Sequence, residues 1–459
     1  MKKEYEIPVK KNQELEVEII DLTHEGLGVA KIAHYPLFIE NALPTEIVKV
    51  HVLKVGKKFG YAKVLDYIKT SKDRVEGANN QLIRTGIAPL QHLTYPAQLI
   101  FKRNQIVNVL AKTAKLPEVS VLSTIGMEQP YGYRNKAQIP VRKVNGELET
   151  GFFKKNSHEL VPMTDFYIQD PKIDEAIVIV RNILRKFNVK PYDEVEHTGN
   201  IRNIIVRRGH YSHEMMIILV TRTEKIFKNE QITSEIVKAL PEVFSVIHNI
   251  QPAKSNAILG KESRVLFGKD SFRDELLGHT FQISPQSFYQ VNTEMAEKLY
   301  QIAIDFADLK PEDIAIDAYC GIGTIGQSFA KKVKHVYGVE IVKEAIQDAK
   351  INANLNDIEN ATYEVGSAEN VMHDWVKDGI KPSVVFVDPP RKGLTDSFIR
   401  ATAEVQPEKV IYISCNAATF ARDVKLFDEL GYKTEKVQPV DLFPQTYHVE
   451  LVALLQRVK

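Results

Sequence analysis

Cysteine is the scarcest chemically useful residue in this sequence, with only two among 459 residues. Two thiols do not build a disulfide framework, and they are too few for a four-thiolate zinc site or for an iron–sulfur cluster held by cysteines. We therefore expect a protein of a reducing compartment that carries neither a structural metal nor an iron–sulfur cluster.

Long apolar runs are missing as well. The longest, Met215 to Val220, is far too short to cross a bilayer, and the first six residues lack the apolar stretch of a secretory signal. The overall balance, 44% hydrophobic and 26% charged, is that of a globular protein of two to four domains. Nothing indicates a protein partner, so we expect a cytoplasmic monomer.

Charge is balanced overall at +1 but is unevenly distributed. Residues 301–459 contain eighteen Lys/Arg and twenty-four Asp/Glu, whereas residues 67–300 carry a net charge of +7. A basic front half joined to an acidic back half fits a polyanion binder coupled to a second activity. The other interpretation is that the basic residues of this front half simply belong to solvated faces.

Residues 1–67 predict a small β-barrel. Segments 15–20 and 47–55 alternate apolar and polar residues, and glycine-containing turns separate such segments. About five strands in so short a stretch predict a closed barrel of the oligonucleotide-binding type. Next to Lys57, the aromatic residues Phe59 and Tyr61 either stack on bases or fill the barrel core.

Residues 68–280 mix helix and strand patterns, which predicts a central α+β domain. A long helix is expected over 92–115, opened near Pro96, and we expect it to pack on the C-terminal domain. Segments 133–140 and 200–207 resemble strands with Arg or Lys on the polar side. These side chains, Arg134 among them, are either RNA contacts or members of an exposed face.

Residues 281–459 alternate strands and helices, which predicts an α/β domain with a parallel sheet. A strand over 313–319 runs directly into a G-x-G-x-x-G loop formed by Gly321, Gly323 and Gly326. The following helix and strand end in Glu340, an acid placed to bind ribose hydroxyls. This order predicts a Rossmann-like fold that binds a nucleoside-containing cofactor.

The glycine loop does not by itself choose the cofactor. The pyrophosphate of NAD needs the helix N-terminus, whereas S-adenosylmethionine has no phosphate and its cationic methionine end prefers a nearby acid such as Asp317. Both cofactors remain open on this motif.

Two further strand ends carry reactive side chains. The strand near 384–387 ends in Asp388, followed by Pro-Pro-Arg, and the strand near 409–414 ends in Cys415. Carboxyl ends of parallel strands share one edge of a sheet, so both side chains are expected in the same cleft. A thiol at a helix N-terminus is a candidate nucleophile. The other thiol, Cys320, is predicted to be buried packing.

Several motifs together resemble the RNA uracil-5-methyltransferase family. They are Ser287-Phe-Tyr-Gln-Val-Asn-Thr293, Asp388-Pro-Pro-Arg-Lys-Gly393, Ser414-Cys-Asn416 and His448-Val-Glu450. Segments 21–30 and 57–62 also resemble a TRAM domain. The resemblance implies S-adenosylmethionine as cofactor and RNA as partner. The barrel resembles the 23S rRNA branch of the family, because the tRNA branch lacks it; tRNA is the alternative substrate.

The resemblance also implies roles for individual residues. Cys415 would attack carbon 6 of uracil, and Glu450 would be the general base that removes the proton from carbon 5. The cofactor-binding positions would be Gln290, Tyr319, Gly321, Gly323, Glu340 and Asp388. The substrate-binding positions would be Phe288, Gln290, Asp388, Lys57 and Arg134.

One departure from the family concerns its iron–sulfur cluster. Residues 85–88 and Phe166 stand where the family carries cysteines, so we expect no cluster and a central domain held by packing alone. Two other functions stay open: an NAD-dependent oxidoreductase, which leaves Cys415 and Asp388 unexplained, and a non-catalytic RNA-binding factor.

Overall fold

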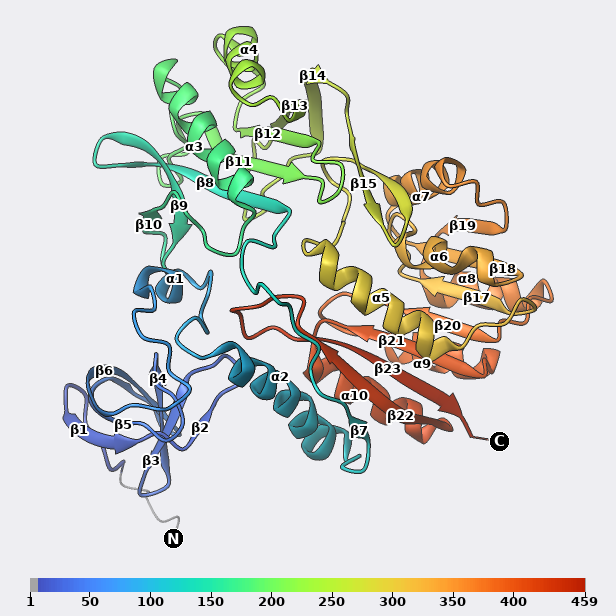
Figure 1. The fold of residues 1–459 in the computed structure, drawn as a ribbon, viewed down its shortest axis with the longest axis horizontal. Helices are drawn as coiled ribbons and strands as arrows, with labels where there is room; N and C mark the ends of the chain where they lie inside the picture. The colour runs from blue at the N-terminus through green and yellow to red at the C-terminus, as the bar shows by residue number, and fades with distance from the viewer. Residues whose placement is uncertain (1–6, 459) are drawn as a thin grey trace.

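The computed structural model describes residues 7–458, which form four sheets with helices packed around them (Figure 1). The mixed α/β architecture confirms the predicted fold class. Within the described residues, no helix is both long and apolar enough to span a membrane.

The first sheet is rolled up at the N-terminal end of the molecule, in the strand order β1-β5-β6-β4-β3-β2 (Figure 1). Alternate apolar side chains point inward and form one small core. The sheet has six strands rather than about five, because the two-residue β2 pairs with β3. The strands are β1 (Glu14–Glu18), β2 (Asp21–Leu22), β3 (Gly28–Ile32), β4 (Tyr35–Glu40), β5 (Ile47–Val55) and β6 (Gly60–Lys69).

The central sheet has the order β10-β9-β8-β11-β12-β13-β14 and packs against two helices. Amphipathic α3 (Pro171–Lys186) and α4 (Asn229–Ala239) bury their apolar faces in its core. The strands are β8 (Lys136–Val144), β9 (Glu147–Phe153), β10 (Leu160–Pro162), β11 (Ile201–Arg208), β12 (Met215–Thr221), β13 (Val243–Ile250) and β14 (Glu262–Gly268).

Apolar packing fills the region around residues 85–88 and Phe166, where the resemblance leads one to look for cluster cysteines. Ile87 and Ala88, just after α1 (Asn80–Thr85), lie in the same buried core as Phe166, which is fully buried and packs edge-on against Phe152. A ring and two aliphatic side chains therefore hold these segments together.

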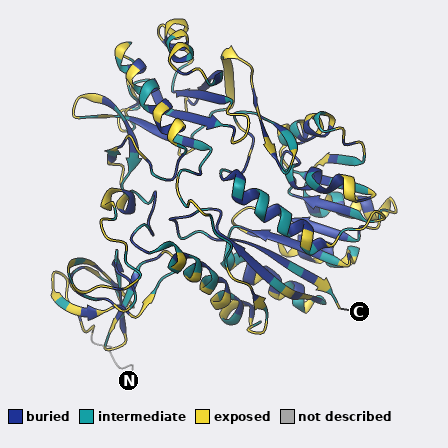
Figure 2. Cartoon of the chain, in the orientation of Figure 1, coloured by how far each residue is buried: buried dark blue, intermediate teal, exposed yellow. Residues whose placement is uncertain are grey.

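The C-terminal sheet has the order β19-β18-β17-β20-β21-β23-β22-β7. Strands β17 to β21 are parallel, whereas β23 runs antiparallel to both of its neighbours. Apolar residues bury the inner strands β17, β20 and β21 on both faces, whereas the edge strand β19 is partly exposed (Figure 2). The strands are β17 (Ile314–Ala318), β18 (His335–Glu340), β19 (Ala361–Val365), β20 (Val384–Val387), β21 (Lys409–Ser414), β22 (Tyr432–Val440) and β23 (Glu450–Arg457).

Six helices cover this sheet within the described residues, and a two-stranded hairpin precedes them. The hairpin strands are β15 (Phe272–Leu276) and β16 (His279–Ile283). The helices are α5 (Thr293–Ala307), α6 (Thr324–Phe329), α7 (Lys343–Leu355), α8 (Ala368–Lys377), α9 (Asp396–Val405) and α10 (Ala417–Glu429).

Helix α2 (Tyr95–Val109) connects the barrel to the C-terminal sheet. It packs on α10, and the chain beyond it adds β7 (Ser120–Val121) to the sheet beside β22. The helix begins at Tyr95, with Pro96 in its first turn, where a missing N–H costs nothing. It ends in a π turn over Leu110–Ala114.

Two arginines expected on a polar strand face are buried instead. The Arg202 guanidinium donates to the carbonyl oxygens of Gln251 and Ala253, and Arg207 donates to carbonyls of the segment that follows β16. Because each guanidinium finds backbone acceptors, the charge is tolerated inside the protein. These two residues are therefore not surface contacts for RNA.

Candidate active site

Four of the predicted site residues lie at one edge of the C-terminal sheet. Tyr319, Asp388 and Cys415 directly follow the parallel strands β17, β20 and β21. Glu450 is the first residue of β23, and the antiparallel register pairs Ser414 with Leu451. Continuing that register by one residue places Cys415 opposite Glu450.

Burial controls the ionisation of these groups. It raises the pKa of Glu450 to about 8 and that of Asp388 to about 7, because a carboxylate loses its hydration. Burial, with the charges of Glu450 and Asp388, raises the pKa of the Cys415 thiol to about 12. The Arg391 charge acts in the opposite direction on Cys415 and Glu450.

The glycine loop follows β17 in an unusual backbone conformation. Tyr319, Gly321 and Gly323 have φ values of 65°, 54° and 85°. A Cβ on Gly323 would lie 2.5 Å from the side-chain amide of Gln327, so glycine is required there by space as well as by φ. Glu340, at the end of neighbouring β18, accepts a hydrogen bond from the backbone N–H of Val342.

Asp317 lies buried beneath this loop. Its Oδ2 accepts a 2.8 Å hydrogen bond from the N–H of Gly326, whereas its Oδ1 has no partner among the described residues. Burial, followed by the charges of Asp388 and Glu340, raises the pKa of Asp317 to about 7.

These carboxylates fit a cationic ligand. Besides burial, the charge of Asp388 raises the pKa of both Asp317 and Glu450, and that of Glu340 raises the pKa of Asp317, so a positive group in the cleft relieves a repulsion that the protein otherwise contains. The sulfonium and ammonium groups of S-adenosylmethionine have this charge, and Asp317 Oδ1 is the orphaned acceptor that such a group needs. The same carboxylates oppose the pyrophosphate of NAD.

The segment from Ser284 to Asn292 forms another wall. Buried Arg207 donates to the carbonyl oxygens of Ser284 and Ser287, and the Asn135 side chain donates to that of Gln290. On this clamped backbone Gln290 is buried against the Tyr300 hydroxyl. Phe288 is 69% exposed, which leaves its ring free to stack.

The loop 441–449, which leads into Glu450, is tied to α2. Fully buried Lys102 pairs with Asp441 at 2.5 Å and also donates to the carbonyl oxygen of Phe443. The side-chain amide of Gln98 donates a hydrogen bond to Gln445 Oε1, and Gln98 Oε1 accepts one from the backbone N–H of Gln445. Helix α2 therefore determines where this loop, and the strand start behind it, lie.

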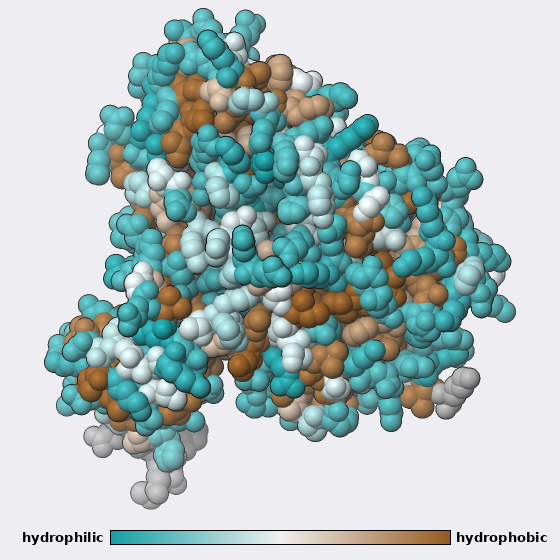
Figure 3. Space-filling model, viewed as in Figure 1, coloured by the Kyte–Doolittle hydropathy of each residue, from teal (hydrophilic) through white to brown (hydrophobic). Residues whose placement is uncertain are grey.

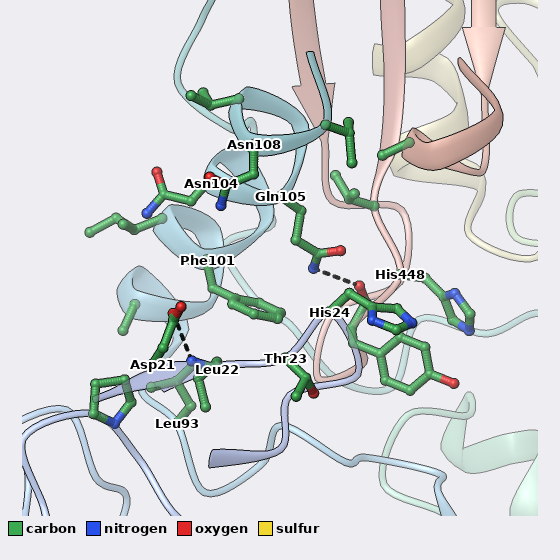
Figure 4. A pocket seen from close by; sticks show the side chains of 18 of the residues that line it. Asp21, Leu22, Thr23, His24, Leu93, Phe101, Asn104, Gln105, Asn108 and His448 are labelled. Atoms are coloured by element: carbon green, nitrogen blue, oxygen red, sulfur yellow. Dashed lines mark hydrogen bonds between the residues drawn. The ribbon is translucent and has the colours of Figure 1, made fainter. Parts of the chain in front are cut away.

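A cleft of about 1120 Å³ leads from the barrel to Cys415. In Figure 4 the barrel residues Thr23 and His24 face α2, and Gln105 of α2 reaches the loop that carries His448. The α2 side is lined by amides and an aromatic ring. They are Phe101, Asn104, Gln105 and Asn108.

The two remaining residues that were predicted to contact RNA, Arg134 and Lys57, lie in different parts of the molecule. Burial lowers the pKa of His448 most, and the charges of Arg391, Lys102 and Arg134 lower it further, so Arg134 lies near the strand start that carries Glu450. Burial lowers the pKa of the Arg134 guanidinium itself. Lys57 is exposed on the barrel and does not line the cleft that contains Cys415.

Several residues that shape this site escaped the sequence interpretation. Arg207 was expected to be either an RNA contact or a member of an exposed face, and Gln98, Lys102 and Asn135 were not singled out. Only Gln98 and Lys102 could have been found from the sequence, because they lie in the helix that was expected to pack on the C-terminal domain. A lysine and a glutamine on the packed face of a helix need buried partners.

The chain is similar to proteins of one family along nearly its whole length. A family model described as tRNA (uracil-5-)-methyltransferase matches residues 258–458, and a TRAM domain model matches residues 8–65. An uncharacterized RNA methyltransferase of Streptococcus agalactiae is 58% identical over 445 residues, which cover 97% of this chain and 99% of that protein. A similar protein of Streptococcus mutans is 57% identical over 447 residues, which cover 97% of this chain and 99% of that protein.

A solved structure extends this likeness to the fold. The crystal structure of Pyrococcus abyssi tRNA (uracil-54, C5)-methyltransferase in complex with S-adenosyl-L-homocysteine matches with a TM-score of 0.77 at 26% identity. The match covers 96% of this chain and 99% of that one. S-adenosylmethionine rather than NAD is thereby confirmed as the cofactor. The chain belongs to the family of S-adenosylmethionine-dependent RNA uracil-5-methyltransferases.

Proposed function

We propose that this protein methylates carbon 5 of a uridine in 23S rRNA through a covalent bond between Cys415 and the base. The observation that carries the proposal is the juxtaposition of Cys415 and Glu450 across β21 and β23, next to Asp388 and the glycine loop. A nucleophile and a base at one strand edge, beside a cationic cofactor site, are what this reaction requires.

The cofactor would lie against the glycine loop. Asp317 would pair with its ammonium group, Glu340 with the ribose hydroxyls, and Gln290 and Asp388 would face its reactive end. Tyr319 would pack against the adenosine, and the glycines at 321 and 323 let the backbone approach closely. When bound, S-adenosylmethionine supplies an electrophilic methyl group on a cationic sulfur.

The protein side chains then activate an unreactive base. Carbon 5 of uracil is a weak nucleophile, but addition of the Cys415 sulfur at carbon 6 converts the ring to an enolate whose carbon 5 accepts the methyl group. Glu450 next takes the proton from carbon 5, and the returning electron pair expels the sulfur from carbon 6. Because the free thiol is held protonated by burial, Cys415 becomes reactive when cationic ligands fill the cleft.

RNA binding would begin on the barrel surface. Phe59 and Tyr61 are 42% and 38% exposed, and their rings cluster with that of Phe38 at centroid distances of 5.2 to 5.8 Å. They are therefore not core residues, and Lys57 lies beside them. Such a ring cluster next to lysines suits base stacking and phosphate binding. The target uridine would leave its stack and rest on Phe288, near Arg134.

We also propose the domain division and setting of this activity. Residues 1–67 would be the RNA-binding barrel, 68–280 the central RNA-binding domain and 281–459 the methyltransferase domain, with α2 and β7 attached to the last. We propose that the protein acts on RNA as a monomer in the cytoplasm.

One observation favours tRNA as the substrate instead. The Pyrococcus abyssi protein, named for uracil-54 of tRNA, matches 96% of this chain, so the match extends into the barrel region. The expectation that tRNA enzymes lack the barrel therefore does not hold for that protein, and the barrel is no argument against tRNA.

The deciding experiment is incubation of the protein with labelled S-adenosylmethionine and unmodified 23S rRNA or tRNA, followed by mapping of 5-methyluridine. Cys415→Ser should lower the rate by at least about 10⁴-fold, because the oxygen nucleophile is far weaker, yet retain cofactor binding. Undiminished methylation by this variant, or no methylation of either RNA by the wild type, would contradict the proposal.

A further inference from the structure

A second cleft lies in the central domain, on the side away from Cys415. It has a volume of about 810 Å³ and is lined by the residues that follow α3, the two residues before β11, the segment 222–229 that leads into α4, and residues of β13 and β14. In Figure 3, apolar atoms lie among hydrophilic ones on the surface between α3 and α4. We call this cleft the distal basic pocket.

Strand β11 connects this pocket with the active site. Its first residue, Ile201, follows the pocket residue Asn200, whereas Arg207 near its other end clamps the segment that carries Phe288. Eight residues of extended chain span roughly 25 Å. A ligand that reaches both places must be a long polymer.

The pocket concentrates positive charge. Its lining includes five cations and one acid, so its net charge is +4 in a chain of +1 overall. The cations are Lys190, Arg222, Lys225, Lys228 and Arg264. Only Arg264 forms ion pairs, with Glu224 and Glu262; within residues 7–458 no carboxylate pairs with the other four. Burial depresses the pKa of His248, so this ring adds no charge at neutral pH.

An exposed aromatic ring stands among these cations. Phe227 is 74% exposed, and the Lys228 ammonium lies 5.4 Å from its ring centroid and 5.8 Å from that of Phe187. An exposed phenylalanine contributes little to the core, whereas an exposed ring with a lysine ammonium beside it is a platform for a base and its phosphate.

We propose that the distal basic pocket binds a single-stranded segment of the RNA substrate, remote from the target uridine, with a base on Phe227 and phosphates on Lys190, Lys225 and Lys228. The identity of this RNA rests on the proposed function. The cleft beside Cys415 has much less charge: two acids and three cations line it. The distal pocket would therefore supply affinity, and the active-site cleft would select the uridine.

The test compares Phe227→Ala and Lys190→Glu/Lys225→Glu with the wild type and with Lys331→Glu/Lys332→Glu. The last pair makes the same charge change on an exposed turn of the C-terminal domain. Dissociation constants are measured for protein-free 23S rRNA and tRNA transcripts and for a short uridine oligonucleotide, over a range of salt concentrations.

We expect both pocket variants to weaken binding of the methylated transcript about tenfold. The charge variant should also lower the salt slope by about 1.4, the loss of two phosphate contacts. The dissociation constant of the oligonucleotide, that of S-adenosylmethionine and the rate at saturating RNA should not change. Unchanged melting temperatures would show that folding is intact.

Unchanged affinity for both transcripts would overturn the pocket proposal, and so would equal weakening by the control pair. Weakened binding of ribosomal particles but not of protein-free RNA would identify a protein partner instead. If the wild type binds RNA through the pocket but transfers no methyl group, the proposed function fails and the pocket stands.

Discussion

At the residue scale, buried carboxyls make the candidate active site dependent on pH and on its cationic ligand. Asp317 and Asp388 have their pKa raised to about 7, and Glu450 to about 8. Because these pKa values lie above the unfolded value near 4, the contribution of the carboxyls to stability is fully present below pH 4 and is lost as the pH rises from about 4 to about 8. The ligand-free protein therefore loses stability over this range, and a bound cation restores it.

Glu450→Gln should trap the reaction after methyl transfer. The amide cannot accept the proton from carbon 5, so the bond between Cys415 and carbon 6 persists. We expect a covalent protein–RNA adduct, seen as a slow band on a denaturing gel, and turnover reduced by about 10²- to 10⁴-fold. The double variant Cys415→Ser/Glu450→Gln should form no such band. Normal turnover by Glu450→Gln would exclude it as the base.

Asp317→Asn should make the fold more stable and weaken cofactor binding. It removes a buried ionisable group while retaining an acceptor for the Gly326 N–H, so the free energy of unfolding at pH 8 should rise by about 3 kcal/mol, with less gain at pH 5. Affinity for S-adenosylmethionine should fall with the loss of the anion. Unfolding and calorimetric titrations measure both, and exposed Asp305→Asn is the control. Equal cofactor affinity in Asp317→Asn would contradict the proposed pairing.

At the element scale, α2 holds in place a loop of another domain. The helix lies outside residues 258–458, which the methyltransferase family model matches, yet its buried Lys102 and Gln98 bond the loop before Glu450. The Gln105 side chain adds a 3.1 Å hydrogen bond to the carbonyl oxygen of Tyr447. The position of Glu450, the proposed general base, is therefore set by a helix that belongs to the segment between the barrel and the central domain.

Variants of Lys102 should separate two effects of the Lys102–Asp441 pair: its contribution to the stability of the fold and its positioning of the loop before Glu450. Breaking the pair by Lys102→Met leaves Asp441 buried alone, which should cost about 3 to 5 kcal/mol of unfolding free energy. Lys102→Met/Asp441→Leu should restore most of that stability. Its turnover number should stay low, because the Phe443 carbonyl still lacks its donor, while the Michaelis constant for S-adenosylmethionine changes little. Full activity of the stable double variant would show that this pair does not position the loop.

At the scale of the whole molecule, candidate RNA contacts are spread over the barrel, the active-site cleft and the central domain. The aromatic cluster of the barrel lies on the surface, the cleft between barrel and α2 ends at Cys415, and the distal basic pocket lies at the far end of β11. A substrate that touches all three is a folded RNA with unpaired segments.

Phe59→Ala/Tyr61→Ala should raise the Michaelis constant for RNA about tenfold by removing two stacking surfaces. The rate at saturating RNA and the affinity for S-adenosylmethionine should stay the same, because the rings are outside the cleft that contains Cys415. Ile68→Ala, which removes another exposed side chain of the barrel, is the control. Unaltered kinetics in the double variant would exclude the ring cluster from RNA binding.

Local sequence patterns were enough to predict the fold class, the glycine loop and the strand ends. The strand over 335–340 lies where the alternation places it, and Asp388 and Cys415 each follow a short apolar run. These features depend on residues adjacent in the chain, so periodicity and turn residues reveal them.

Partnerships between distant segments required the tertiary structure. Strand β23 inserts antiparallel between β21 and β22, and only this order brings Glu450 opposite Cys415. Arg207 is a polar residue on a strand in either interpretation, and its burial depends on carbonyl oxygens about 80 residues away. Sequence thus determined which chemical groups are present and which strand ends carry them, whereas packing between remote elements decided which groups meet, because sheet order minimises the free energy of the whole chain.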